Sequence, residues 1–181
     1  MRPIARLAIV VGVQLLIVVG LIGFKQYTLW TADDVLLRVQ TGDPRDLVGS
    51  RAAPVRYEIS ELDLNELAGD RDVFAMAWVE LQEQPDGYWQ AVAVHGDGGE
   101  RSFDGTVLLK GEIRDYRFGS ARGEPTIVVA YGIEDVFIAS GDGVPSGDGH
   151  DVAMKVAVDR WGEGIPRDFY IDGERFDLTR R

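Results

Sequence analysis

The chain has 181 residues, no cysteine and a net charge of −11 at pH 7. Without cysteine it can form no disulfide, thiolate metal site or lipid-modified cysteine. Residues 1–25 hold three basic residues and no acidic ones, so the remaining residues carry −14. Because nucleic acid repels so acidic a segment, we expect no nucleic-acid binding.

An apolar run of eighteen residues extends from Leu7 to Phe24, with Gln14 as its only strongly polar side chain. As an α-helix it would be about 27 Å long, close to the thickness of about 30 Å of a bilayer core. We predict that residues 1–30 form a cytoplasmic tip and a transmembrane anchor, with residues 7–24 in lipid. Because basic residues favour the cytoplasmic side, those before the run predict an N-terminus in the cytoplasm and the remainder of the chain on the outer side of the cell membrane. A cleaved signal peptide and a buried core helix are the alternatives.

Residues 31–181 are predicted to form one extracytoplasmic domain rich in β-structure. Many glycines and alternating apolar residues favour short strands joined by turns. The predicted strands are 35–39, 54–60, 72–82, 88–95, 106–116, 126–131, 136–138, 152–158 and 169–171. Residues 72–82 are apolar on both faces, which is typical of a central strand. The predicted fold is therefore all-β, a single transmembrane helix followed by one antiparallel β-barrel or β-sandwich.

Several local features are also predicted. Asp43 should cap a short helix that begins at Pro44. Residues 61–71 should form a loop or a helical turn, and Gly111 should mark a β-bulge. The rings of Trp78, Trp89 and Trp161 should pack into the core or a groove.

Two stretches resemble a known family. The sequence Asp43-Pro44-Arg45-Asp46-Leu47, followed by Tyr57-Glu58-Ile59-Ser60, resembles the signature region of the GDYXXLXY family of bacterial membrane-anchored proteins. A second stretch, Tyr131-Gly132-Ile133-Glu134, and Ile171-Asp172-Gly173 near the C-terminus are also similar. The similarity spans about residues 5 to 176. The resemblance implies a membrane-anchored protein that works beside a polytopic membrane protein, without an established activity.

The chain departs from this family in the naming motif itself. The family glycine, aspartate and tyrosine fall on Ser50, Arg51 and Ala52, and Val55 and Tyr57 keep the later L-x-Y character.

The motif residues are the candidate site. We expect a cluster in which Arg45 pairs with Glu134 and joins the two motif loops, a role that fixes register more than it adds stability. The alternative is a surface for a ligand or partner. The candidate residues are Asp43, Pro44, Arg45, Asp46, Tyr57, Tyr131, Gly132 and Glu134.

For the other polar groups we expect no functional role. His95 and His150 are expected to be solvated, and the Asp/Gly-rich loops at 97–100 and 141–151 to be solvated rather than to bind calcium. We predict no cofactor. A Ser50/Lys110 dyad in a membrane-tethered domain would be similar to type I signal peptidases. The competing interpretation is a turn serine and a lysine that reaches solvent.

These observations predict a single-pass membrane protein whose β domain is a non-catalytic interaction module for a polytopic membrane partner. Two alternatives stay open. One is a membrane-tethered hydrolase that uses the Ser50/Lys110 dyad, and the other is a β domain that binds a small ligand in a groove lined by Trp and Tyr.

Overall fold

The computed structural model describes residues 3–40, 43–47, 54–70, 72–96, 101–118, 125–135, 144–145, 147 and 149–176. The chain divides into two compact units, Met1–Ala32 and Asp33–Arg181. The first unit contains one helix, α1 (Pro3–Trp30), whose described side chains between residues 11 and 23 are all exposed. No helix in the described part of the chain combines the length and hydropathy needed to cross a bilayer.

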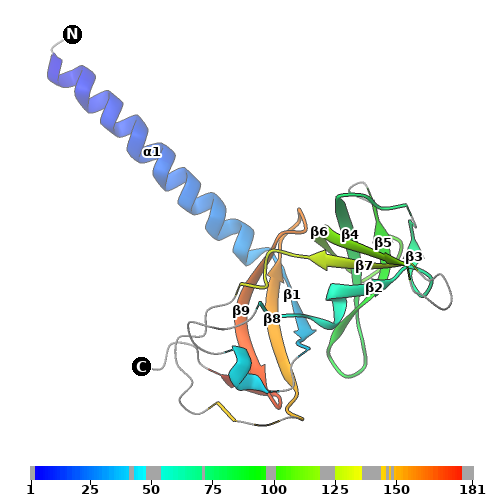
Figure 1. Ribbon diagram of the computed structural model, residues 1–181. Coiled ribbons are helices and arrows are strands. Elements are labelled where there is room, and N and C mark those ends of the chain that lie inside the picture. Colours follow the sequence, from blue (N-terminus) through cyan, green and yellow to red (C-terminus); the bar gives the residue numbers. More distant parts are fainter. Residues whose placement is uncertain are drawn as a thin grey trace. The chain divides into compact units, whose positions relative to one another are not determined.

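The second unit is built from two β-sheets, so the predicted predominance of β-structure is confirmed (Figure 1). The smaller sheet has the order β1 (Asp33–Arg38), β8 (Val152–Val158), β9 (Gly164–Ile171) and β10 (Glu174–Phe176). The larger has the order β2 (Glu61–Asp63), β7 (Pro125–Ala130), β6 (Val107–Phe118), β4 (Met76–Glu83), β5 (Trp89–His95) and β3 (Ala68–Gly69). Neighbours are antiparallel except for the parallel pair β3 and β5. Two short 3-10 helices, η1 (Pro44–Leu47) and η2 (Glu58–Ser60), complete the domain.

Both sheets bury apolar side chains in one common core. Alternation along each strand supplies them, because successive side chains point to opposite faces. β4 lies between β5 and β6, so the prediction of a central strand is confirmed. The core residues include Val35, Leu37, Val79, Leu81, Leu109, Ile127, Met154 and Phe169.

Polar contacts join the two sheets at the end of β1. Beyond this strand, Val39 forms an isolated antiparallel bridge with Tyr57. The Arg38 guanidinium lies 3.1 Å from Asp151 and 3.6 Å from Asp86 in the β4–β5 turn, and stacks 4.0 Å above the ring of Tyr88. Arg38 therefore links β1 in the small sheet to the β4–β5 turn in the large one.

The predicted strand at 54–60 is wrong: residues 54–56 have no regular structure, Tyr57 forms only the isolated bridge with Val39, and residues 58–60 form η2. The backbone carbonyl of Tyr57 accepts a hydrogen bond from the N–H of Ser60, and the Ser60 hydroxyl accepts one from the N–H of Tyr57. This pair of contacts closes η2 in place of an extended strand. Val55, Tyr57 and Ile59 are nevertheless all buried, as their alternation predicted. The predicted loop at 61–71 contains the short strands β2 and β3.

Gly111 is not the site of a bulge. Its pairing with Ala77 in β4 is regular, and the irregularity in β6 falls between Ile113 and Asp115, opposite β7. Residues 136–138, predicted as a strand, lie outside the described residues.

A buried carboxylate sits on β4. Glu80 is fully buried, and its side chain accepts hydrogen bonds from the hydroxyl of Thr106 and from the backbone N–H groups of Ser102 and Phe103. His95 Nε2 lies 3.0 Å from the same carboxylate. The prediction of a solvated His95 is therefore wrong: this ring is buried across the hairpin from Glu80.

These contacts determine the ionisation of Glu80. Burial alone would raise its pKa, but the hydrogen bonds from Thr106, His95 and the two backbone N–H groups outweigh burial and lower the pKa to about 2. The carboxylate therefore stays charged and holds the segment 102–106 against the sheet.

We expect Glu80 to make the domain sensitive to acid. Because the folded pKa is lowered, its contribution to stability is fully present above about pH 4.5 and is lost as pH falls toward 2. A difference of this size is worth about 3 kcal/mol. Chemical denaturation at a series of pH values should show the wild type losing about this much more stability than Glu80→Gln between pH 5 and pH 2. Parallel curves for the two proteins would contradict the assignment.

Candidate functional site

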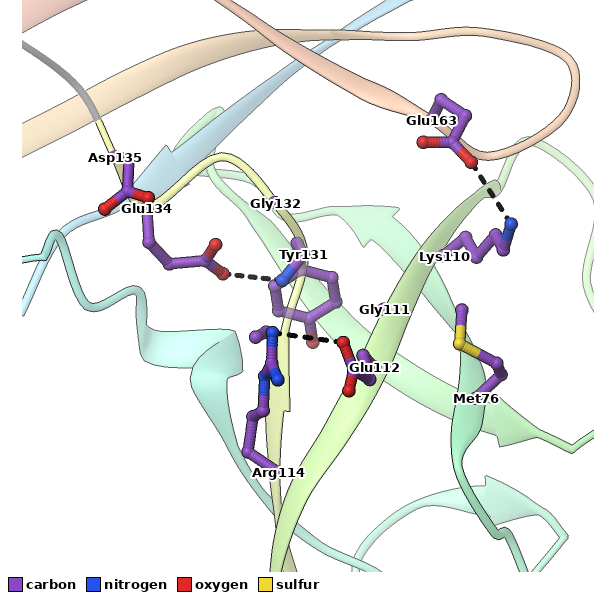
Figure 2. A pocket seen from close by; sticks show the side chains of 11 residues that line it. Met76, Lys110, Gly111, Glu112, Arg114, Tyr131, Gly132, Glu134, Asp135 and Glu163 are labelled. Atoms are coloured by element: carbon purple, nitrogen blue, oxygen red, sulfur yellow. Dashed lines mark hydrogen bonds and ion pairs between the residues drawn. The ribbon is translucent and has the colours of Figure 1, made fainter.

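Part of the predicted cluster lines an open pocket of about 270 Å³ (Figure 2). Tyr131, Gly132 and Glu134 form one side of it, immediately after β7. Lys110, Glu112 and Arg114 approach from β6, and Glu163 from the β8–β9 turn. The lining is mostly charged and contains no tryptophan. It therefore differs from the groove of Trp and Tyr that the ligand-binding alternative predicted.

Beneath the pocket, the two motif segments are joined by reciprocal hydrogen bonds. The Tyr57 hydroxyl donates to the carbonyl of Ile133 over 2.8 Å, and the Tyr131 hydroxyl donates to the carbonyl of Ile59 over 2.6 Å. Both tyrosines are buried, with 0% and 5% of their surface exposed. We call this arrangement the tyrosine interlock. In it, each tyrosine hydroxyl supplies a donor to a backbone carbonyl of the other segment.

Burial also fixes the protonation of both tyrosines. Desolvation, with a smaller contribution from the nearby Glu134 carboxylate, raises the pKa of Tyr57 and of Tyr131 well above the usual value. Both hydroxyls therefore stay protonated and serve as hydrogen-bond donors. Proton abstraction is not chemistry that they can perform near neutral pH.

The turn after β7 is shaped by Gly132 and Glu134. Gly132 has φ of +75°, a left-handed conformation that glycine adopts without strain. The turn lets the Glu134 carboxylate accept a hydrogen bond from the backbone N–H of Tyr131, and Figure 2 shows this contact. The Glu134 carbonyl accepts a hydrogen bond from the N–H of Val55. The turn is thus fixed to both its own strand and the segment before η2.

Gly111 gives the interlock room. A Cβ atom at this position would lie 2.3 Å from Val129 Cγ1 and 2.9 Å from Tyr131 Cδ1, both closer than real contacts allow. Its role is close packing against the Tyr131 ring rather than the predicted bulge.

The cations of the pocket are paired within the chain. Arg114 lies 3.0 Å from Glu112, and Lys110 Nζ lies 3.1 Å from Glu163. Figure 2 marks both ion pairs. Lys110 is one-third exposed and lies 5.8 Å from the ring centre of Trp78. A lysine general base needs an apolar site, whereas the Lys110 side chain is partly exposed and paired with a carboxylate. Ser50, its proposed partner, lies outside the described residues.

The structure describes only some of the other predicted site residues. η1 begins at Pro44, as predicted, and Asp43 precedes it half-buried. The side chains of Arg45 and Asp46 lie outside the described part of the chain, so their pairing with Glu134 stays a prediction. In the loop before β8, His150 Nδ1 lies 2.7 Å from Asp172, and Asp151 binds Arg38.

Sequence reasoning missed Met76, Glu112, Arg114 and Glu163 as pocket residues. The sequence held one weak signal for two of them. If the predicted strands at 72–82 and 106–116 had been paired in the observed register, Met76 would have been placed opposite Glu112. Nothing in the sequence indicates that the β8–β9 turn crosses to this sheet.

We expect the two hydroxyls of the interlock to be coupled energetically. Tyr57→Phe and Tyr131→Phe should each lower the free energy of unfolding by about 1–3 kcal/mol, because each leaves a buried carbonyl without its donor. The double variant should lose less than the sum, since one broken contact loosens the other. Urea denaturation of the four proteins measures the coupling. Tyr170→Phe in β9 is the matched control, and losses no larger than those of this control would contradict the interlock.

Comparison with known proteins gives one result. The model of the GDYXXLXY protein family matches residues 14–169, a range that includes both motif segments and nearly all of the β domain. Neither curated proteins nor solved structures gave a significant match. Since the family model covers most of the sequence, the chain is a member of the GDYXXLXY protein family.

Proposed function

We propose that this protein is a single-pass membrane protein whose extracytoplasmic β domain is a non-catalytic interaction module for a polytopic membrane protein. The observation that carries the proposal is the tyrosine interlock. The hydroxyl groups of the two motif tyrosines donate their hydrogen bonds to backbone carbonyls inside the domain. The motif therefore builds a fixed turn at the surface and leaves its tyrosines no reactive group to offer.

The anchor is supported by the sequence. The apolar run from Leu7 to Phe24 is eighteen residues long, close to the length that a membrane span requires, and Gln14 is its only strongly polar side chain. The charge difference across the run favours an outside location for the acidic domain. The domain would then face the extracytoplasmic loops of neighbouring membrane proteins.

The partner surface that we propose is the rim of the pocket. Gly132 and Asp135 are exposed beside the charged residues of β6, and the interlock holds their turn from below. A preorganised surface loses little conformational entropy on binding, which favours affinity. Asp135 adds an exposed negative charge to this rim.

The anchor predicts a specific response to alkaline washing. In its native host the chain should stay in the membrane pellet at alkaline pH, and its N-terminus should lie before residue 7. Leu16→Asp should release part of the protein, because a charge at the centre of a span costs about 2.5–3.5 kcal/mol on insertion scales. Leu16→Ala is the matched neutral control. A mature chain that begins after Trp30, or complete release of the wild type, would contradict the anchor.

The interaction module predicts recovery of a partner. Purification in mild detergent at native expression should yield a polytopic membrane protein together with the chain. Asp135→Lys should reduce this recovery by about tenfold or more, because a like charge or a lost ion pair at an interface is unfavourable. Glu83→Lys, an equivalent charge reversal at the exposed end of β4, should leave recovery unchanged. Equal recovery with both variants would exclude this rim as the partner surface, and repeated purification of the chain alone would contradict the module.

A further inference from the structure

We propose that the β8–β9 turn, residues 159–163, is a second membrane contact in which Trp161 enters the headgroup layer of the bilayer. The inference rests on the proposed membrane anchor, and it identifies a lipid surface as an additional partner of the domain. The sequence predicted Trp161 inside the core or a groove, but 41% of its surface is exposed. The position of this ring therefore needs another explanation.

The turn is tightly built. The Asp159 carboxylate accepts hydrogen bonds from the backbone N–H groups of Trp161 and Glu163, both over 2.9 Å. The backbone of Asp159 exchanges two further hydrogen bonds with the turn, accepting from Gly162 and donating to Glu163. Gly162 has φ of +81°, which lets the chain reverse without strain. Asp159 thus fixes the backbone that carries Trp161.

The turn is also fastened to the larger sheet. The Gly162 carbonyl accepts a hydrogen bond from the N–H of Lys110 over 2.8 Å, and the Lys110 ammonium pairs with Glu163. The backbone at Gly162 packs directly on the Trp78 ring, where a Cβ atom would lie 2.7 Å from Cζ3. The Trp161 ring is therefore held outside the core by a rigid support, with the Arg160 guanidinium 4.1 Å from its centre.

The turn lies close to the point where the chain enters the domain. Asp33, the first residue of β1, is paired with Val158, the last residue of β8. The two strands lie side by side in Figure 1. The segment from Trp30 to Asp33 spans at most about 11 Å. From Val158 to Trp161 the reach is similarly short, about 11 Å at full extension. If the helix ends in the interface, the turn is within reach of the same interface.

A second exposed aromatic residue lies toward the same end. The β4–β5 turn contacts Arg38 at the far end of β1, so the start of β4 lies on the opposite side, beyond Trp78. Phe74, just before β4, is 77% exposed, and Ala75 beside it has an unfavourable φ of 62°. Residues held in such sparsely populated backbone conformations cluster at active sites, ligand clamps and switch regions.

The chemistry of the turn favours a lipid interface. Tryptophan is enriched at the headgroup level because its ring is apolar and its N–H is polar. An arginine beside it can extend its guanidinium toward phosphate while its methylene groups stay on apolar surface. Because the domain is strongly acidic, attraction to anionic headgroups cannot hold it there. The contact is therefore expected on zwitterionic lipid and depends on the aromatic ring.

The absence of cysteine makes a direct test possible. The full-length chain carrying Trp161→Cys, labelled with an environment-sensitive fluorophore, is reconstituted in phosphatidylcholine vesicles with and without nitroxide on the headgroups. Glu83→Cys, at the exposed end of β4 away from this turn, is the matched control. The label at residue 161 should shift its emission to shorter wavelength and be quenched by the nitroxide lipid, whereas the label at residue 83 should behave as in water.

The outcomes separate this inference from the anchor. Flotation of the vesicles after an alkaline wash first shows whether the chain is inserted. If it is inserted and the label at residue 161 stays as aqueous as that at residue 83, the lipid contact is overturned and the anchor stands. A label that is shielded in native membranes but not in pure lipid vesicles also overturns the lipid contact and assigns the turn to a protein partner. A chain that does not float at all refutes the anchor and this inference together.

Discussion

The domain depends on two hydroxyl groups that each satisfy a carbonyl in the other's segment. Tyr57 forms the isolated bridge with Val39, which follows β1 of the smaller sheet, and Tyr131 follows β7 of the larger sheet. Their exchange of hydrogen bonds therefore joins the sheets at a point where neither has a regular strand pairing with the other. Gly111 leaves room for the Tyr131 ring, and the Gly132 turn positions Glu134. Because Gly111, Tyr131, Gly132 and Glu134 also line the pocket, these contacts determine the shape of one of its sides.

The sequence predicted local elements well and long-range contacts poorly. Strict alternation located β8, and the Pro85-Asp86-Gly87 turn located the hairpin of β4 and β5. Alternation also predicted the buried side of residues 54–60, although the hydrogen bonds of Ser60 close a helical turn there. The proximity of the two motif segments was suggested only by a family resemblance, since no local rule pairs residues more than seventy positions apart. Glu80 was missed because alternation assigns it to the outward face, and nothing in the sequence shows that residues 102–106 cover that face.

The degraded naming motif takes on a specific meaning in this context. The departures fall on Ser50, Arg51 and Ala52, whereas Val55 and Tyr57 keep the family character. Both retained positions are buried, and they contact Glu134 and Ile133 in the second motif segment. The contacts that fix the turn after β7 can therefore form in this chain despite the departures.

The pairing of β1 with β8 imposes an order on biosynthesis. Asp33 and Val158 are register partners although 125 positions separate them. β1, the first strand to leave the ribosome, can therefore pair only when β8, one of the last strands, has been synthesised. At about 5–20 residues per second, roughly 6–25 s pass before that partner exists. During this interval the backbone of β1 has no ladder, and closing so long a loop is slow. The small sheet can therefore form only after β8 has been synthesised, and a chain truncated before residue 152 cannot form it.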